Sequence, residues 1–389
     1  MSSAAYAETG PSRTTTPPHP HSRSGSRTTP TLSALRPPQG AGQLNPEVLV
    51  SVRDLHVSFG AVEAVRGLSF DVRKGEVLAV VGESGAGKSL TARALLGMPP
   101  QEARVTGSVR MGPHELVGAP RPVRAALWGR QLALVPQDAL SALSPVHRVA
   151  DQLAAAVRSV DGVSRKKARA RAVAALEEVG IPADRTRAYP HEFSGGMRQR
   201  AVIAMALLRS PALVTADEPT TAQDPETQRR LLDLLTHRSR AAGTTLVLVT
   251  HDLSLVRDHA DRVLVMYAGR LAEEGPVEEV FTSPRAPYTA GLLASAPLQG
   301  RGAVTSAAPP RGRTQPRPTR GRLPSIPGTP PNPTALPPGC AFAPRCPLAE
   351  ATRCHTEHPE PQTHNNRTVA CHHWRELRAQ SAELFLEST

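Results

Sequence analysis

Short apolar runs alternate with longer segments of helical periodicity between residues 47 and 297. A continuous apolar run of about four to eight residues is typical of a buried strand, and apolar positions recurring every three or four residues are typical of a helix. Strands that alternate with helices in this way indicate an α/β domain with a largely parallel sheet. Strands are expected at residues 48–52, 77–81, 132–136, 212–216, 244–250 and 262–267, and helices at residues 89–96, 167–179, 197–208, 226–241 and 253–260.

Both ends of the chain depart from this pattern. Residues 1–46 are rich in Ser, Thr, Pro and Arg and hold too few large apolar side chains to offset the entropy of ordering, so we expect a disordered tail. Residues 298–338 form a linker rich in Pro and Arg, and residues 339–389 contain all four cysteines. We therefore expect four regions: the tail, the α/β domain over residues 47–297, the linker, and a small cysteine-containing module.

The net charge of +12 would suit a nucleic-acid-binding protein, but the longest basic run is only RKK at residues 165–167. A solvated surface rich in Arg explains the charge, and no nucleic-acid partner is expected. No apolar stretch approaches the roughly 18 residues that a membrane-spanning helix needs, and no apolar run of signal-peptide length follows the first arginines. We expect a protein that is soluble or bound peripherally to a membrane.

A phosphate-binding loop follows the strand at residues 77–81. The next residues, GESGAGKS at 82–89, fit the pattern G-x-x-x-x-G-K-[ST] at Gly82, Gly87, Lys88 and Ser89. Glycines let backbone N–H groups turn toward a phosphate, and the helix that begins here adds the positive end of its dipole. We expect Lys88 to reach the outer phosphates and the Ser89 hydroxyl to bind Mg²⁺.

An acidic pair, Asp217 and Glu218, follows the strand at residues 212–216. A carboxylate at the tip of a strand beside a phosphate loop can hold the metal through its water shell, and a second one can orient or deprotonate an attacking water. Upstream, Ser194, Gly195 and Gly196 open a long helix, where free N–H groups make a second surface for phosphate. Together the motifs predict nucleotide hydrolysis.

At this point the sequence resembles the nucleotide-binding subunits of ABC transporters. Six ordered motifs carry the resemblance: GESGAGKS, the glutamine of VPQD, FSGGM, TADEPTT, the AQD turn and the histidine of VTHD. It implies an ABC-type P-loop nucleotide-binding domain with a RecA-like core, an antiparallel β subdomain and a helical signature subdomain, followed here by a small cysteine-containing C-terminal extension. Its cofactors would be ATP and Mg²⁺.

The resemblance also implies a role for each motif residue. The loop Gly82, Glu83, Ser84, Gly85, Ala86, Gly87, Lys88, Ser89 and Leu90 would bind the phosphates. Gln137 would sense the γ-phosphate and Mg²⁺, and would share the metal with Ser89 and Asp217. Glu218 would be the general base and His251 the γ-phosphate switch. Phe59, at the end of an early strand, would stack on adenine, although a Phe at a strand end is more often part of the core.

Two such domains meet head to tail in this family, so Ser194, Gly195 and Gly196 of one chain would face the ATP bound to its partner. Because the chain has one copy of each motif, a second ATPase subunit is implied. Two residues depart from the usual pattern: Gln223 replaces an aliphatic residue in the AQD turn, and Phe193 replaces the commoner Leu. Gln223 could alter communication between the two ATP sites.

Three further stretches resemble the ATPases of dipeptide and oligopeptide importers: QDALSALSPVHRVADQL at residues 137–153, APYTAGLLASAP at 286–297, and the tail from residue 323 through ACHHW. The implied function is to energise peptide uptake from the cytoplasmic face of the plasma membrane, with two permease subunits and an extracytoplasmic binding protein. The second ATPase would be a different chain or a second copy. Nickel chelates, other metal complexes or sugars remain alternative cargoes, and a soluble ABC ATPase acting on nucleic acid is disfavoured.

The cysteines Cys340, Cys346, Cys354 and Cys371 gather in the last part of the chain. Disulfides seldom persist in a reducing cytosol, and four thiolates around one metal centre would fold such a tail. Zinc usually draws on C-x2-C pairs, which do not occur here, whereas irregular spacing with a Pro after a cysteine also suits an iron–sulfur cluster. Resemblance to peptide-importer ATPases favours a [4Fe-4S] cluster, with zinc, no metal, or a mixed site with His355, His372 or His373 as alternatives.

Overall fold

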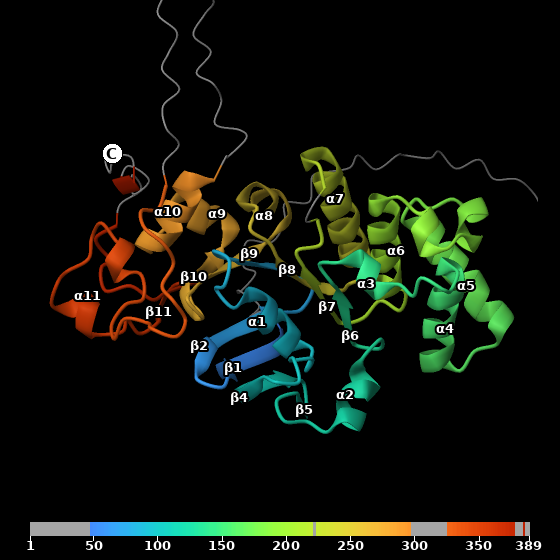
Figure 1. Ribbon diagram of the computed structural model, residues 1–389, viewed down its shortest axis with the longest axis horizontal. Coiled ribbons are helices and arrows are strands. Elements are labelled where there is room, and N and C mark those ends of the chain that lie inside the picture. Colours follow the sequence, from blue (N-terminus) through green and yellow to red (C-terminus); the bar gives the residue numbers. More distant parts are fainter. Residues whose placement is uncertain (1–46, 221–222, 297–324, 378–383, 386–389) are drawn as a thin grey trace, which may run out of the picture. The chain divides into compact units, whose positions relative to one another are not determined.

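A computed structural model of the protein describes residues 47–220, 223–296, 325–377 and 384–385. The N-terminal tail and most of the linker therefore lie outside the described residues, as do Pro297 and the middle of the TTAQD turn. The structure contains an eight-stranded sheet, a four-stranded antiparallel sheet, and helices that follow most strands (Figure 1).

The eight-stranded sheet has the order β11-β12-β10-β9-β3-β8-β7-β6. Its central strands β6 (Leu132–Val135), β7 (Leu213–Asp217), β8 (Thr245–Val249), β3 (Val77–Val81) and β9 (Arg262–Tyr267) pair in parallel. Every residue of β3, β7, β8 and β9 is buried, which explains why these strands read as unbroken apolar runs. Their bounds agree with the expected ones within two residues.

The smaller sheet has the order β2-β1-β4-β5 and contains β1 (Val48–Phe59), β2 (Val62–Arg73), β4 (Arg104–Met111) and β5 (His114–Glu115). Strand β1 continues seven residues beyond its expected end at residue 52. In that continuation only Leu55 and Val57 are buried. Buried and exposed residues alternate here, as in a strand with one face in the core, so no continuous apolar run predicts this part of β1. The short turn after Phe59 returns the chain directly into β2.

The expected helices are all present, with bounds shifted by at most two residues: α1 (Lys88–Leu95), α5 (Arg165–Glu178), α6 (Gly195–Leu207), α7 (Pro225–Ala241) and α8 (Leu253–His259). Side chains of Ser164, Ser194, Asp224 and Asp252 cap the starts of α5 to α8. The structure adds α2 (Arg121–Leu127), α3 (Ala139–Ala142), α4 (Val149–Asp161), α9 (Val277–Thr282), α10 (Pro287–Ser295) and α11 (Arg353–Thr356). The long helix α4 follows Arg148, which makes no side-chain cap, so its start carried no local signal.

The C-terminal region shares the core of the α/β domain. Strand β12 (Arg367–Val369) pairs with β10 (Arg270–Pro276), and β11 (Gln362–His364) pairs with β12, so both extend the main sheet. Phe342 is buried in one apolar cluster with residues of β9 and α10. The buried Arg367 guanidinium forms an ion pair with the fully buried Glu273 of β10. The cysteine region is therefore packed onto the sheet that carries the phosphate loop.

Candidate nucleotide-binding and cysteine sites

The loop between β3 and α1 adopts a conformation that needs glycine at two points. Gly82 and Gly87 have φ angles of 149° and 92°. A Cβ atom on Gly82 would lie 2.2 Å from the carbonyl oxygen of Met266, and one on Gly87 would lie 2.5 Å from that of Ala64. Because both neighbours are backbone atoms, they cannot move away as a side chain could. Gly82 and Gly87 are therefore needed because the loop lies close to the backbones of β2 and β9.

Lys88, the first residue of α1, is 7% exposed and folds back over the loop. Its Nζ donates to the carbonyl oxygens of Gly82 (2.9 Å) and Glu83 (3.0 Å). Burial lowers the pKa of Lys88, and the charges of Glu218, Asp217 and Glu83 oppose that shift. The ammonium group is thus held at the mouth of the loop, where the expected role in binding outer phosphates would place it.

Ser89 and Asp217 come together from different elements. The Ser89 hydroxyl at the start of α1 donates to a carboxylate oxygen of Asp217, the last residue of β7, at 2.7 Å. Asp217 is 4% exposed. A hydroxyl and a carboxylate are hard oxygen donors of the kind Mg²⁺ prefers, so these two side chains fit the expected metal site.

Glu218 follows Asp217 and turns in a different direction, because its backbone has a φ of 43° and its N–H donates to the Val249 carbonyl at 2.9 Å. Its carboxylate accepts a hydrogen bond from the Gln137 side chain (3.3 Å) and lies 3.4 Å from Nδ1 of His251. These three residues come from the ends of β7, β6 and β8. A carboxylate oriented in this way can accept a proton from a water molecule bound beside the phosphate loop.

Ser194, Gly195 and Gly196 stand at the start of α6, where the Ser194 side chain accepts from the N–H of Met197 at 3.3 Å. Helix α6 packs against α3, α4, α5, α7 and β6, whereas α1 packs against β2, β4, β7 and β8. The loop at residues 82–89 and the motif at residues 194–196 are therefore supported by different elements of one chain. Gln223 lies beside this motif, with its side-chain nitrogen 3.4 Å from where a Cβ of Gly195 would be, and Phe193 is buried.

Phe59 is half-buried at the end of β1 and pairs with Val62 across the turn. It packs against the apolar cluster that includes Val57 and Val65. Phe59 therefore takes part in the core, and its stacking on adenine stays a prediction.

Two residues without an assigned role also contact the loop. The hydroxyl of Tyr288 in α10 accepts a hydrogen bond from the N–H of Glu83 at 2.8 Å. The Arg345 guanidinium donates to both carboxylate oxygens of Glu83, at 2.7 and 2.9 Å. Both belong to stretches whose resemblance to peptide-importer ATPases was evident, but nothing in their local spacing indicates contact with a loop more than 200 residues earlier in the chain.

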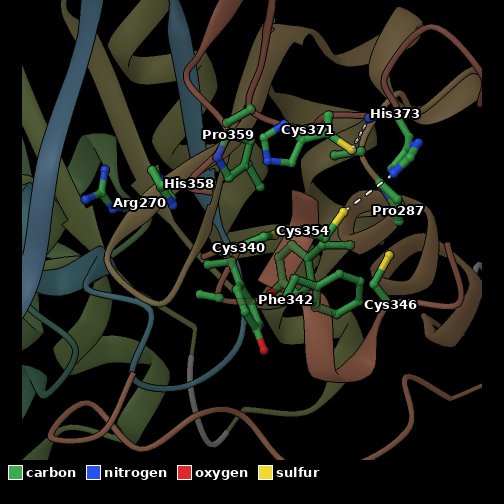
Figure 2. A pocket seen from close by; sticks show the side chains of 18 of the residues that line it. Arg270, Pro287, Cys340, Phe342, Cys346, Cys354, His358, Pro359, Cys371 and His373 are labelled. Atoms are coloured by element: carbon green, nitrogen blue, oxygen red, sulfur yellow. Dashed lines mark hydrogen bonds between the residues drawn. The ribbon is translucent and has the colours of Figure 1, made fainter. Parts of the chain in front are cut away.

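All four cysteines line one cavity, together with Tyr267, Tyr288, Phe342, His358, His372 and His373 (Figure 2). The cysteines are free thiols, and Sγ of Cys354 lies 3.5 Å from Nε2 of His373. Burial raises the pKa of Cys340, that of Cys346 to about 11 and that of Cys371 to about 12. Across the described residues, no three His, Cys, Asp or Glu side chains are grouped closely enough to hold a single metal ion as they stand.

Two family models match the chain. Residues 65–221 match the model described as "ABC transporter", and residues 272–317 and 311–354 match "Oligopeptide/dipeptide transporter, C-terminal region". The first match contains the phosphate loop and the acidic pair. The second contains Tyr288, Arg345 and the first three cysteines.

Curated relatives agree with both matches. The chain is 45% identical over 319 residues to the oligopeptide transport ATP-binding protein OppD of Mycobacterium tuberculosis, covering 80% of this chain and 49% of that protein. It is 44% identical over 310 residues to the dipeptide transport ATP-binding protein DppD of Bacillus subtilis, covering 77% and 87%. The chain thus spans about half the length of the mycobacterial relative and most of the Bacillus one.

Solved structures share the fold of the ATPase region. The ATP-binding cassette MJ0796 with ADP and Pi aligns with a TM-score of 0.53 at 23% identity, covering 59% of this chain and 98% of that one. CbiO1 from Clostridium perfringens, part of the transporter complex cbiONQ, aligns with a TM-score of 0.54 at 25% identity, covering 60% and 91%. The ABC ATPase fold expected from the motifs is confirmed. This chain belongs to the ABC transporter family of oligopeptide and dipeptide transport ATP-binding proteins.

Proposed function

We propose that this protein is the ATP-hydrolysing subunit of an importer of dipeptides or oligopeptides. The observation that carries the proposal is the grouping of Ser89, Asp217 and Glu218 beside the loop that holds Lys88, in a chain whose C-terminal region matches peptide transporters. The loop supplies phosphate-binding N–H groups and the ammonium group of Lys88. Ser89 and Asp217 would hold Mg²⁺, which neutralises phosphate charge when bound.

Glu218 is the proposed general base. It would accept a proton from water as the water oxygen bonds to the γ-phosphorus and the bond to the bridging oxygen of ADP breaks. The contacts of Gln137 and His251 with the Glu218 carboxylate orient that base and connect it to the neighbouring strand ends. Positioning of this kind, rather than covalent chemistry, accounts for most catalysis of phosphoryl transfer.

The proposed active unit is a head-to-tail pair of ATPases. Ser194, Gly195 and Gly196 present the start of α6, and the elements that support α6 differ from those that support α1. A second ATPase, either a different chain or a second copy, would bring its own phosphate loop to this surface. Closure with ATP and reopening after hydrolysis would then drive the transporter.

We place the permease contact at residues 137–146. This segment joins the Gln137 end of β6 to the short helix α3 and finishes at Val146, whose exposed fraction of 73% is the highest among the large hydrophobic residues that the structure describes. An exposed apolar side chain at the end of the segment that begins with Gln137 suits contact with a short cytoplasmic helix of a permease. No helix in the described ranges is long and apolar enough to cross a membrane. The proposed location is the cytoplasmic face of the plasma membrane, with a binding protein acting on the other side.

We propose a [4Fe-4S] cluster in the cysteine cavity. Four free thiols line one cavity, which fits a four-thiolate donor set. Because no three His, Cys, Asp or Glu side chains in the described residues are grouped to hold a metal ion, the proposal depends on the four-cysteine donor set and on the resemblance to peptide-importer ATPases. Cys340, Cys346, Cys354 and Cys371 would hold it, and its role would be structural because no redox substrate is suggested. Zinc is the alternative.

Peptide uptake by cells with and without this chain tests the transport function. Uptake of a labelled tripeptide should be lost on deletion, restored by the wild type and not restored by Glu218→Gln. Uptake of nickel and of a sugar serves as the comparison. Loss of nickel or sugar uptake with normal tripeptide uptake would contradict the assignment of cargo.

Metal analysis tests the cysteine cavity. Anaerobically purified full-length protein should contain iron and acid-labile sulfide in equal amounts and absorb in the visible range. A quadruple variant with all four cysteines changed to serine is the control and should lack both. Zinc without iron or sulfide would contradict the cluster and support a zinc site at the four cysteines.

A further inference from the structure

Glu83, the second residue of the phosphate loop, is contacted on three sides. Its carbonyl oxygen accepts a hydrogen bond from Lys88 at 3.0 Å, and its N–H donates to the hydroxyl of Tyr288 at 2.8 Å. Its carboxylate accepts hydrogen bonds from two nitrogens of the Arg345 guanidinium. The first contact belongs to the phosphate site. The other two come from residues that match the C-terminal region of oligopeptide and dipeptide transporters, so Glu83 connects that matched region to Lys88 through its own backbone.

Arg345 is itself firmly held. Its guanidinium is nearly buried, donates to the Pro327 carbonyl at 2.8 Å and to the Tyr267 hydroxyl at 3.1 Å, and lies over the rings of Tyr267 and Phe342 at 5.9 and 6.0 Å. A guanidinium group that other contacts already hold in place loses little conformational entropy when it binds a carboxylate. Arg345 is therefore built to fix the position of Glu83.

The same side chains form a wall of the cysteine cavity. Tyr267, Tyr288 and Phe342 line that cavity and pack against one another, with ring centroids 4.5 to 5.4 Å apart. Arg345 immediately precedes Cys346, which also lines the cavity. The groups that anchor the loop and the groups that enclose the thiols are thus a single packed unit.

We propose that Arg345 is a positioning residue for ATP binding: it holds Glu83 so that the Glu83 carbonyl keeps Lys88 at the mouth of the phosphate loop. Tyr288 supports the same loop from the N–H side. The C-terminal region therefore sets nucleotide affinity in addition to marking a peptide importer. This inference rests on the proposed ATP site, although it does not depend on which solute is carried.

Nucleotide binding to the full-length chain tests the proposal without a partner or a transport assay. A fluorescent ATP analogue with Mg²⁺ is titrated into the wild type, Arg345→Gln, Arg345→Lys, Glu83→Gln and the double variant Arg345→Gln/Glu83→Gln. Arg345→Gln and Glu83→Gln should each bind about tenfold more weakly, since each removes a charge-assisted pair. The double variant should be no weaker than the weaker single variant, and Arg345→Lys should recover part of the affinity.

Arg262→Gln is the matched control, because Arg262 also forms buried ion pairs, with Glu76 and Glu274, and Glu76 precedes the start of β3 whereas the loop follows its end. It should lower the melting temperature but leave nucleotide affinity within about twofold of the wild type. The proposal is overturned if Arg345→Gln behaves in the same way, or if the two single effects add in the double variant. Should Arg345→Gln fail to fold, Glu83→Gln and Arg345→Lys still decide the matter. Failure of the peptide-uptake experiment would leave these binding results unaffected, so the two proposals fail separately.

Discussion

The hydroxyl of Ser89 donates a 2.7 Å hydrogen bond to the carboxylate of Asp217, across a sequence separation of 128 residues. Ser89 stands at the start of α1 and Asp217 at the end of β7. Parallel strands place their carboxyl ends at one edge of a sheet, and the strand order brings β7 and β3 to either side of β8. The contact joins the phosphate loop to the acidic strand and defines the expected magnesium site.

Asp217→Asn should weaken Mg²⁺-dependent ATP binding by about tenfold and reduce hydrolysis more strongly, because the metal loses a charged partner. Affinity is measured with and without Mg²⁺. Asp184→Asn, an exposed acid in a short 3-10 helix, is the control and should change neither quantity. Equal loss of affinity with and without the metal would argue that Asp217 acts only on the fold.

Glu218→Gln should keep ATP affinity within about threefold of the wild type while lowering turnover by at least about a hundredfold, because the amide cannot accept the proton. Single-turnover hydrolysis is measured together with size-exclusion chromatography in ATP, which should show a persistent dimer with its partner. Glu226→Gln, on the exposed first turn of α7, is the control. Turnover near the wild-type rate would remove Glu218 as the base.

Lys88→Ala should reduce ATP affinity by about a hundredfold or more, since it removes the buried cation that is proposed to bind the outer phosphates. Isothermal titration with Mg-ATP measures this. The control is Lys74→Ala, because Lys74 is an exposed lysine paired with Glu47. An affinity unchanged by Lys88→Ala would contradict the assignment of the loop.

Val146→Asp should impair peptide uptake while leaving the ATPase rate of the purified chain and its partner within about twofold, because a charge is placed on the proposed permease contact. Val123→Asp is the matched control, since Val123 is 41% exposed and lies on α2, outside the segment 137–146. Normal peptide uptake by the Val146→Asp variant would contradict a permease contact at residues 137–146.

Ionisation of Glu274 should lower the free energy of unfolding as the pH rises from about 4.5 to 7. Burial raises the pKa of this carboxyl to about 7, against the opposing charge of Arg262. Since the unfolded chain releases that proton near pH 4.5, the folded state binds more protons within this interval, and stability declines by about 3 kcal/mol across it. Glu274→Gln should flatten this part of the curve of unfolding free energy against pH. Parallel curves for both proteins between pH 5 and 8 would exclude the effect.

The sequence determined the parts of the site that depend on short-range rules. Gly82 and Gly87 are required by backbone neighbours that would meet any Cβ, so their pattern alone identified the phosphate loop. The strands β3, β7, β8 and β9 are buried on both faces, and such strands must be apolar throughout. Ser194 marks the start of α6 because a capping side chain acts within three residues.

Only the tertiary structure decided how the C-terminal region is used. Arg345 and Glu83 are 262 residues apart, and no periodicity spans such a distance. The pairing of β12 with β10 likewise arises because the folded chain brings an edge of the main sheet to these residues. Spacing showed that four cysteines gather near the end of the chain, whereas the fold decided that their cavity shares Tyr267 and Tyr288 with the support of the phosphate loop. Contacts of this kind depend on the packing of complete elements, which local sequence does not encode.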